Sequence, residues 1–191
     1  MNKTSDFILA SGSPQRLRLL DQIGYAPKKI HPADIDEQCL LHERPLPYVK
    51  RMAIEKAKAV ANLYPNENVL ASDTIVTVGL RILHKSKNAE EQTKVMRLLS
   101  GRNHKVISSV CLIDKNGKIS ERTVITRISM KRLSEEEIAE YVNSNEWVGV
   151  CGYKIEGSLA GFVTNMVGSF TGVVGLPLYE TKNLLTGAGI K

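Results

Sequence analysis

Two charged residues of this sequence lie inside apolar segments, where ionised groups are costly. Lys56 falls in the middle of the apolar stripe of a helix expected over residues 47–64, and Asp73 interrupts the β-branched segment NVLASDTIVTVG. A buried ammonium without a partner costs several kcal/mol, and a buried carboxylate needs a compensating group. The alternatives are a Lys56 whose head group reaches water and an Asp73 that ends a strand and caps a turn. We favour functional roles, because the stripe surrounds Lys56 and β-branched residues follow Asp73 directly.

The segment ILASGSPQRLRLL has the composition of a loop that binds an anion. A short strand is expected to end at Ala10, and a helix to begin after its N-cap Ser13. The N-terminus of a helix directs backbone N–H groups and a positive dipole toward one point. The hydroxyls of Ser11 and Ser13 and the guanidinium of Arg16 add donors at that point. A phosphate cradle and a plain capped helix both fit this segment.

An acidic loop with the sequence HPADIDEQ places Asp34, Asp36 and Glu37 close together. Neighbouring carboxylates repel one another unless water or a cation neutralises them. A solvated acidic loop is one interpretation, and a site for a hard metal ion such as Mg²⁺ is the other. Lys85 follows a hairpin predicted at Gly79 and adds a further cation.

The charged residues together indicate a type of reaction. Cations, carboxylates and an anion-binding loop suit a substrate that carries a metal ion and phosphates. The sequence reveals no Ser or Cys nucleophile with a nearby His base, so attack by water is the simpler chemistry. We therefore predict hydrolysis of a phosphoanhydride, in which a carboxylate activates water and the cations stabilise charge on the phosphates.

The elements that must position these residues mix helices with strands. Further helices are predicted from Asn88 to Leu99, from a capping box at Ser134, and after Pro177. Strands flank the dipeptide Asn116-Gly117, a strong signal for a hairpin. Glycine-rich segments such as GVVGLP predict close approaches of backbone segments. The order of the elements indicates an α/β fold with a mixed, twisted sheet and a cleft.

The composition is that of a globular protein, with 191 residues, 42% hydrophobic and 24% charged. No apolar segment is long enough for a membrane span or a secretory signal, so we expect a cytoplasmic protein with no membrane partner. The three cysteines and four histidines lack the spacing of a disulfide framework or a zinc site. The formal net charge of +6 fits binding of nucleic acid or of a phosphorylated small molecule. Because the basic residues are dispersed and only 5% of residues are aromatic, we expect no nucleic-acid partner.

The sequence resembles the Maf family, whose members are known for inhibition of septum formation and for nucleoside triphosphate pyrophosphatase activity. The resemblance rests on LASGSPQR, YVKRMAIEKA, ASDTIV, SGRNHKV, EWVGVCGYKIEG and GSFTGVVGLPLYE, which follow one another in the family order. It implies a single Maf-like domain over residues 1–191, with two lobes around a central cleft and a fold related to that of inosine triphosphatase. It also implies a hydrolase that converts a nucleoside triphosphate to its monophosphate and pyrophosphate with a divalent metal, Mg²⁺ or Mn²⁺.

The resemblance assigns roles to individual positions. Asp73 corresponds to the general base, and Glu37 together with Asp73 to the carboxylates associated with the metal. Lys56 and Lys85 correspond to further catalytic positions on the phosphate side. The substrate-binding positions are Ser11, Ser13 and Arg16, and the positions that the family associates with choice of base are Gln15, Thr74 and Glu156.

The specificity positions do not match one branch of the family. The branch that acts on dTTP and UTP usually carries Arg, Thr and Gln at the positions of Gln15, Thr74 and Glu156, and the branch that acts on 7-methyl-GTP usually carries an aromatic residue, Gln and Glu. Overall similarity favours dTTP, UTP or related modified nucleotides. The alternatives are a 7-methyl-GTP pyrophosphatase and a non-catalytic regulator of septum formation. The resemblance also suggests a homodimer.

Overall fold

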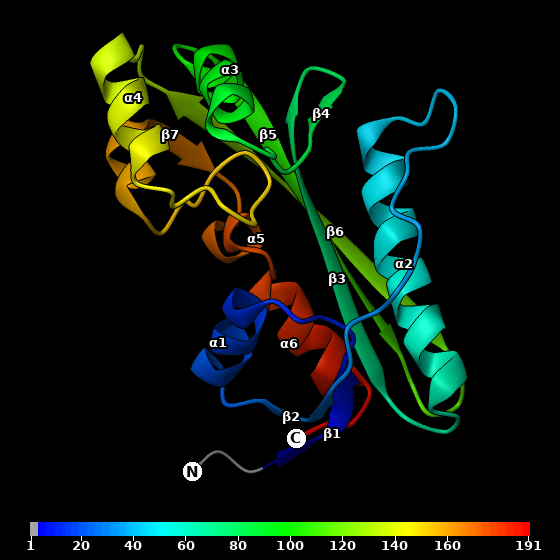
Figure 1. Cartoon of the computed structure of the whole chain (residues 1–191). Coiled ribbons are helices and arrows are strands. Elements are labelled where there is room, and N and C mark those ends of the chain that lie inside the picture. The colour runs from blue at the N-terminus through cyan, green and yellow to red at the C-terminus, as the bar shows by residue number, and fades with distance from the viewer. Residues whose placement is uncertain (1–3) are drawn as a thin grey trace.

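A seven-stranded mixed sheet forms the centre of the computed structural model, which describes residues 4–191 (Figure 1). The strand order is β2-β1-β3-β5-β6-β7, and β4 pairs with β3 outside this path. Strand β1 runs parallel to β2 and β3, and the other pairings are antiparallel. The strands are β1 (Thr4–Leu9), β2 (Ala26–Ile30), β3 (Val69–Val78), β4 (Arg81–Leu83), β5 (Asn103–Ile113), β6 (Ile119–Met130) and β7 (Val163–Val167).

The helices begin at the capping signals that the sequence contains. Ser13 accepts from the first turn of α1, Asn88 accepts from the N–H of Glu91 in α3, and Ser134 forms the predicted capping box with Glu137 in α4. Helix α2 begins at Pro45, a residue suited to the first turn. The helices are α1 (Pro14–Gln22), α2 (Pro45–Leu63), α3 (Ala89–Leu99), α4 (Glu135–Asn143), the 3₁₀ helix η1 (Ser158–Phe162), α5 (Phe170–Val174) and α6 (Leu178–Gly187).

Helices cover both faces of the sheet. The long helix α2 packs on one face through Val49, Met52, Ala53, Ala57 and Val60, against residues of β1, β3 and β5. On the opposite face, α1 and α6 share a core cluster with the same three strands. Figure 1 displays this layering, with α2 on one side of β3 and α1 and α6 on the other. The predicted α/β class with a mixed sheet is confirmed.

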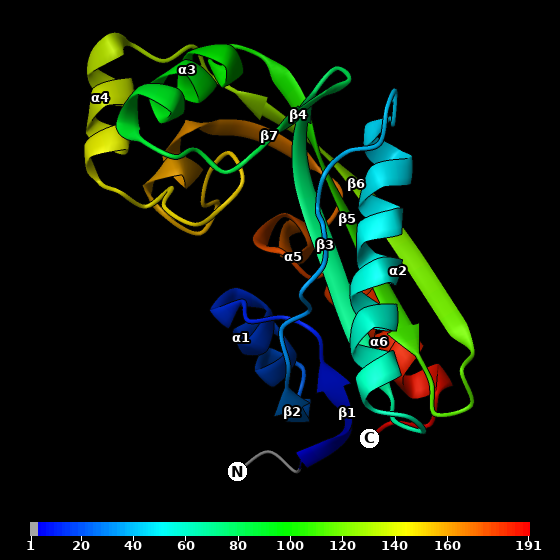
Figure 2. The same ribbon diagram turned by 45° about the vertical axis from the view of Figure 1, so that its right-hand side comes forward.

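The long strands connect two groups of elements. Helices α3 and α4 and strand β7 gather at one end of β3, β5 and β6, and α1, β1, β2 and α6 gather at the other (Figure 2). Each end has its own apolar cluster, one around Met96, Leu99 and Tyr141 and one around Phe7, Leu20 and Leu185. This arrangement gives the two lobes expected from the sequence. Within residues 4–191, no helix is long and apolar enough to cross a membrane.

Some expectations from the sequence need correction. The helix expected over residues 47–64 begins two residues earlier, at Pro45, and ends at Leu63. Strand β2 was not predicted, because its residues are half-buried or exposed and it contains Pro27, a residue typical of edge strands. The segment GVVGLP contributes the end of the short helix α5, which was not predicted, and Gly175 there has a φ of 137°.

Candidate active site

The ion pair between Lys56 and Asp73 lies at the centre of the candidate site. Helix α2 carries Lys56 on the face that packs on the sheet, and the buried strand β3 carries Asp73. Lys56 Nζ lies 2.6 Å from Asp73 Oδ1 and 3.0 Å from Glu37 Oε1. The side chains of Lys56 and Asp73 are each only 10% exposed. Lys56 therefore does not extend its head group to water, and Asp73 does not end the strand but pairs with Lys56 inside it.

The loop between β1 and α1 forms the predicted turn into a helix N-terminus. Ser13 is the N-cap and Pro14 the first helical residue. Arg16 does not project freely, because its Nη1 donates to Ser11 Oγ at 2.9 Å and its Nε donates to the carbonyl of Gly175 at 3.0 Å. Burial lowers the pKa of Arg16, and the nearby charge of Asp73 opposes that shift. The guanidinium is thus held in place beside the loop hydroxyls.

The carbonyl of Gly175 joins its own segment to α1 and to β3. It accepts from Arg16 of α1 and from the hydroxyls of Ser72 and Thr74 of β3, at 3.0, 3.1 and 3.3 Å. Gly175 has a positive φ, which favours glycine, and the Arg16 side chain lies in van der Waals range of the position that a Cβ would take. Thr74 also shares a hydrogen bond of 3.0 Å with Ser108 of β5. These contacts fix the side chain of Thr74 at the wall of the site.

The segment from Gly149 to Gly157 forms the opposite wall. Lys85 reaches it through a β-bridge with Cys151, and Gln92 of α3 donates to the carbonyl of Gly152 at 2.8 Å. Glu146 accepts from the N–H of Ser158 at 2.8 Å, and a Cβ on Gly157 would overlap that carboxylate. These contacts fix the backbone of residues 149–157, which places Lys154 and Glu156 at the site.

A cavity of about 450 Å³ lies between these segments, and all of the predicted site residues except Asp34 and Asp36 line it. The predicted residues that line it are Ser11, Ser13, Gln15, Arg16, Glu37, Lys56, Asp73, Thr74, Lys85 and Glu156. The structure thus brings together residues from both lobes that are far apart in the chain. Asp34 and Asp36 do not line the cavity, and Asp36 accepts instead from the N–H of Gln38 at 2.9 Å.

Several lining residues were not predicted from the sequence. Lys154 contributes a cation, and Val173 and Val174 contribute apolar surface. Cys151 also lines the cavity, where burial raises the pKa of its thiol despite the opposing charge of Lys85. Lys154 could have been predicted from its charge and from its position two residues before Glu156 in GYKIEG. The valines carry no such signal, because apolar residues in a glycine-rich segment are equally typical of a core.

The donor set of the cavity fits a hard divalent cation that the substrate helps to bind. Among residues 4–191, no group of three or more His, Cys, Asp or Glu side chains could enclose a metal ion. Glu37 and Asp73 nevertheless meet at Lys56, so two carboxylates face one point. Mg²⁺ is commonly held by one or two carboxylates together with water and the phosphates of a substrate. The residues present therefore suit a cation that arrives with a phosphorylated ligand.

Comparisons with known proteins place the chain in a family. The model of the Maf-like protein family matches residues 6–188. A protein named dTTP/UTP pyrophosphatase from Mesorhizobium japonicum is 48% identical over 198 residues, which cover 100% of this chain and 95% of the relative. Another of that name from Caulobacter vibrioides is 48% identical over 185 residues, which cover 96% of each chain. The structure of a HAM1 protein from Coxiella burnetii matches with a TM-score of 0.51 and 17% identity, covering 95% of this chain and 98% of that one. That likeness shows the fold alone.

Proposed function

The chain belongs to the Maf-like protein family, and from that premise we propose that it is a nucleoside triphosphate pyrophosphatase. The observation that carries the proposal is the buried Lys56, which joins Asp73 and Glu37 at one end of a cavity that also holds the α1 loop. Relatives that are 48% identical over nearly their full length are named dTTP/UTP pyrophosphatase, which supports dTTP and UTP as substrates.

In the proposed reaction, a water molecule attacks the substrate and the bond between the α and β phosphates breaks. Asp73 accepts the proton of that water, and the products are the nucleoside monophosphate and pyrophosphate. Lys56 orients Asp73, because its ammonium holds one carboxylate oxygen at 2.6 Å. Arg16 and Lys85 face the same cavity, where their charges stabilise the leaving pyrophosphate.

Glu37 and Asp73 would hold the divalent cation, Mg²⁺ or Mn²⁺, together with phosphate oxygens of the substrate. A bound cation supplies neutralisation of the phosphate charge and so favours attack by water. Two carboxylates that share one ammonium already lie close enough to act on one ligand. Release of Lys56 from Glu37 would leave that carboxylate, which is 56% exposed, free to bind.

The base of the nucleotide would lie against Glu156, Thr74 and Gln15, which line the same cavity. The Glu156 carboxylate can only accept hydrogen bonds, and uracil, thymine and guanine each present a ring N–H donor. Glu156 is therefore compatible with dTTP and UTP and also with 7-methyl-GTP, the alternative substrate. The relatives' names favour dTTP and UTP.

The test is release of pyrophosphate from dTTP, UTP, CTP, GTP and 7-methyl-GTP with Mg²⁺ or Mn²⁺. Asp73→Asn should lower kcat by about 10²–10⁴-fold, which is the usual loss when a general base is removed. Asp6→Asn is the matched control, because Asp6 is 68% exposed and does not line the cavity. Full activity of Asp73→Asn would refute the mechanism. If the wild-type protein releases no pyrophosphate from any of these nucleotides, the proposed enzymatic activity is refuted. The non-catalytic regulator of septum formation is then the remaining alternative.

A further inference from the structure

The residue Glu37 lies on a loop that contributes no helix or strand. No residue of the segment 31–44 is buried as a whole, and most of them are exposed. Exposed loops of this kind are usually more mobile than the elements that they connect. A carboxylate that must meet Asp73 at Lys56 needs a fixed backbone, so other residues must hold this loop.

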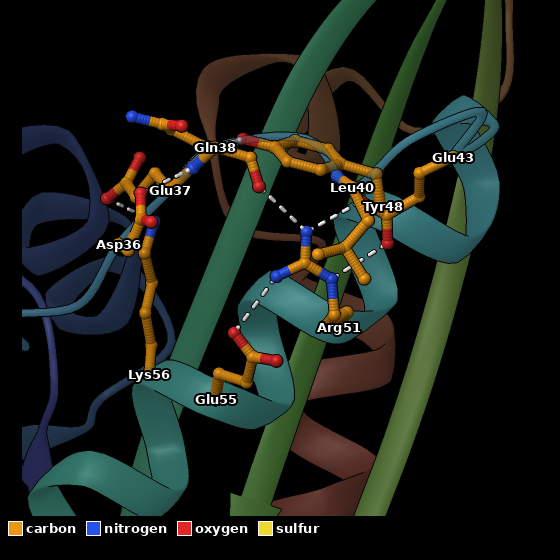
Figure 3. Close-up of polar contacts among 9 residues, drawn as sticks. All are labelled: Asp36, Glu37, Gln38, Leu40, Glu43, Tyr48, Arg51, Glu55 and Lys56. Atoms are coloured by element: carbon orange, nitrogen blue, oxygen red, sulfur yellow. Dashed lines mark hydrogen bonds and ion pairs between the residues drawn. The ribbon is translucent and has the colours of Figure 1, made fainter.

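Arg51 of α2 binds this loop at two points, as Figure 3 shows. Its Nε donates to Glu43 Oε1 at 2.8 Å and its Nη2 donates to Glu43 Oε2 at 2.6 Å. The same Nη2 also donates to the carbonyl of Gln38 at 3.0 Å, directly after Glu37 in the chain. The remaining nitrogen, Nη1, donates to Glu55 Oε2 at 3.1 Å within the helix. A planar guanidinium is suited to such paired contacts, which add directional specificity.

Two further contacts from the same helix fix the backbone next to Glu37. The hydroxyl of Tyr48 donates to the carbonyl of Glu37 at 2.8 Å. Ile35 packs against the apolar cluster that contains Tyr48 and Met52. The residues at positions 48, 51 and 55 lie three and four apart, so they form one side of the helix, and Lys56 follows them. The loop is therefore attached to α2 on both sides of Glu37.

The charges support a firm attachment. The side chain of Glu43 is 8% exposed and that of Arg51 is 20% exposed, so water screens this pair only in part. The hydrogen bonds from Arg51 lower the pKa of Glu43 despite its partial burial. Glu43 also accepts from the N–H of Leu40 at 3.0 Å, which closes the turn after the bound segment. Neither Arg51 nor Glu43 lines the cavity.

We propose that Arg51 and Glu43 are positioning residues, which hold the loop of residues 31–44 on α2 so that Glu37 meets Asp73 at Lys56. The proposal rests on the proposed function, because it gives Glu37 a part in the reaction. It assigns no contact with substrate to either residue. Their contribution to activity must therefore pass through Glu37.

The kinetic test is a double-mutant cycle. Arg51→Met and Glu43→Gln should each lower kcat/KM by about 10–100-fold, the usual effect of losing the partner that orients a functional side chain. In a Glu37→Gln background, the same substitutions should lower it further by less than about 3-fold. A general structural role would lower activity equally in both backgrounds, and equal losses would overturn the proposal. Arg51→Lys keeps the charge without the paired contacts, and it replaces Arg51→Met in the cycle if that variant does not fold.

A second measurement needs no substrate. Hydrogen–deuterium exchange of residues 31–44 should become on the order of 10-fold faster or more in Arg51→Met, because paired charge-assisted contacts are lost. The matched control is Arg97→Met, which removes another paired contact between an arginine and a glutamate, Glu135, on the surface of α3 and α4. It should leave this segment unchanged. Unchanged exchange in Arg51→Met would overturn the proposal. This measurement also separates the proposal from the proposed function, since it gives a result even if the wild-type protein hydrolyses no nucleotide.

Discussion

Removing one partner of the Lys56–Asp73 pair should destabilise the protein far more than removing both. Lys56→Met leaves the Asp73 carboxylate buried without its ammonium, and Asp73→Asn leaves the ammonium with Glu37 alone. Glu37 is 56% exposed, so it compensates only in part. The double variant Lys56→Met/Asp73→Asn leaves no uncompensated charge at the position of the pair.

The magnitude follows from the geometry of the pair. At the observed 2.6 Å, two unit charges attract by about 6 kcal/mol at an effective dielectric constant of about 20. Removal of each ion from water costs several kcal/mol, so the intact pair contributes little net stability. Loss of one partner leaves the cost of the other, about 3–5 kcal/mol. The double variant should therefore be more stable than either single variant, although it should be catalytically inactive.

Urea unfolding of the wild type, both single variants and the double variant measures these free energies. The control is Lys28→Met, because Lys28 also pairs with two carboxylates, Glu67 and Asp6, the latter at the same 2.6 Å, but these lie on the surface and Asp6 is 68% exposed. That substitution should cost about 1 kcal/mol or less, as is usual for surface pairs. Additive losses in the double variant, or a loss in Lys28→Met as large as in Lys56→Met, would refute the reasoning. Pyrophosphate release from the same preparations then separates stability from catalysis.

Other substitutions test the walls of the cavity and the buried core. Glu156→Gln should raise the ratio of kcat/KM for UTP over that for 7-methyl-GTP by about 10-fold, because an amide also donates hydrogen bonds. An unchanged ratio would show that Glu156 does not select the base. Gly157→Ala should raise KM by roughly 10-fold because its Cβ would displace Glu146, whereas Gly161→Ala, whose Cβ meets no atom within 4 Å, should leave KM unchanged. Burial lowers the pKa of His104 to about 4, below the usual ~6.5, so the unfolded chain binds a proton that the folded chain excludes between these values. Stability should therefore fall by up to about 3 kcal/mol as the pH drops through this range, and His104→Gln should show a smaller fall in urea unfolding.

Local sequence patterns were sufficient for most of the fold. The cap residues Ser13, Asn88 and Ser134 begin their helices as predicted, because a cap depends on groups within one turn. Strand β2 was missed because an edge strand with little buried surface carries no hydrophobic pattern.

The sequence could reveal those site residues whose charge is unusual in their immediate apolar surroundings. A lysine on an apolar stripe and an aspartate in a buried strand are unusual by themselves, so the sequence alone singled out Lys56 and Asp73. It also contained the strand, loop and N-cap that place Ser11 and Ser13, because these depend on adjacent residues.

The tertiary structure decided which of these groups meet. The carbonyl of Gly175 accepts from Arg16, which lies 159 residues away in the chain. Because every residue has a backbone carbonyl, the sequence does not indicate which one accepts this hydrogen bond. Arg51 and Glu43 are ordinary charged residues until the loop folds back on α2 and pairs them. Local sequence determines what a residue prefers, whereas the partner of a charge depends on contacts that only the folded chain creates.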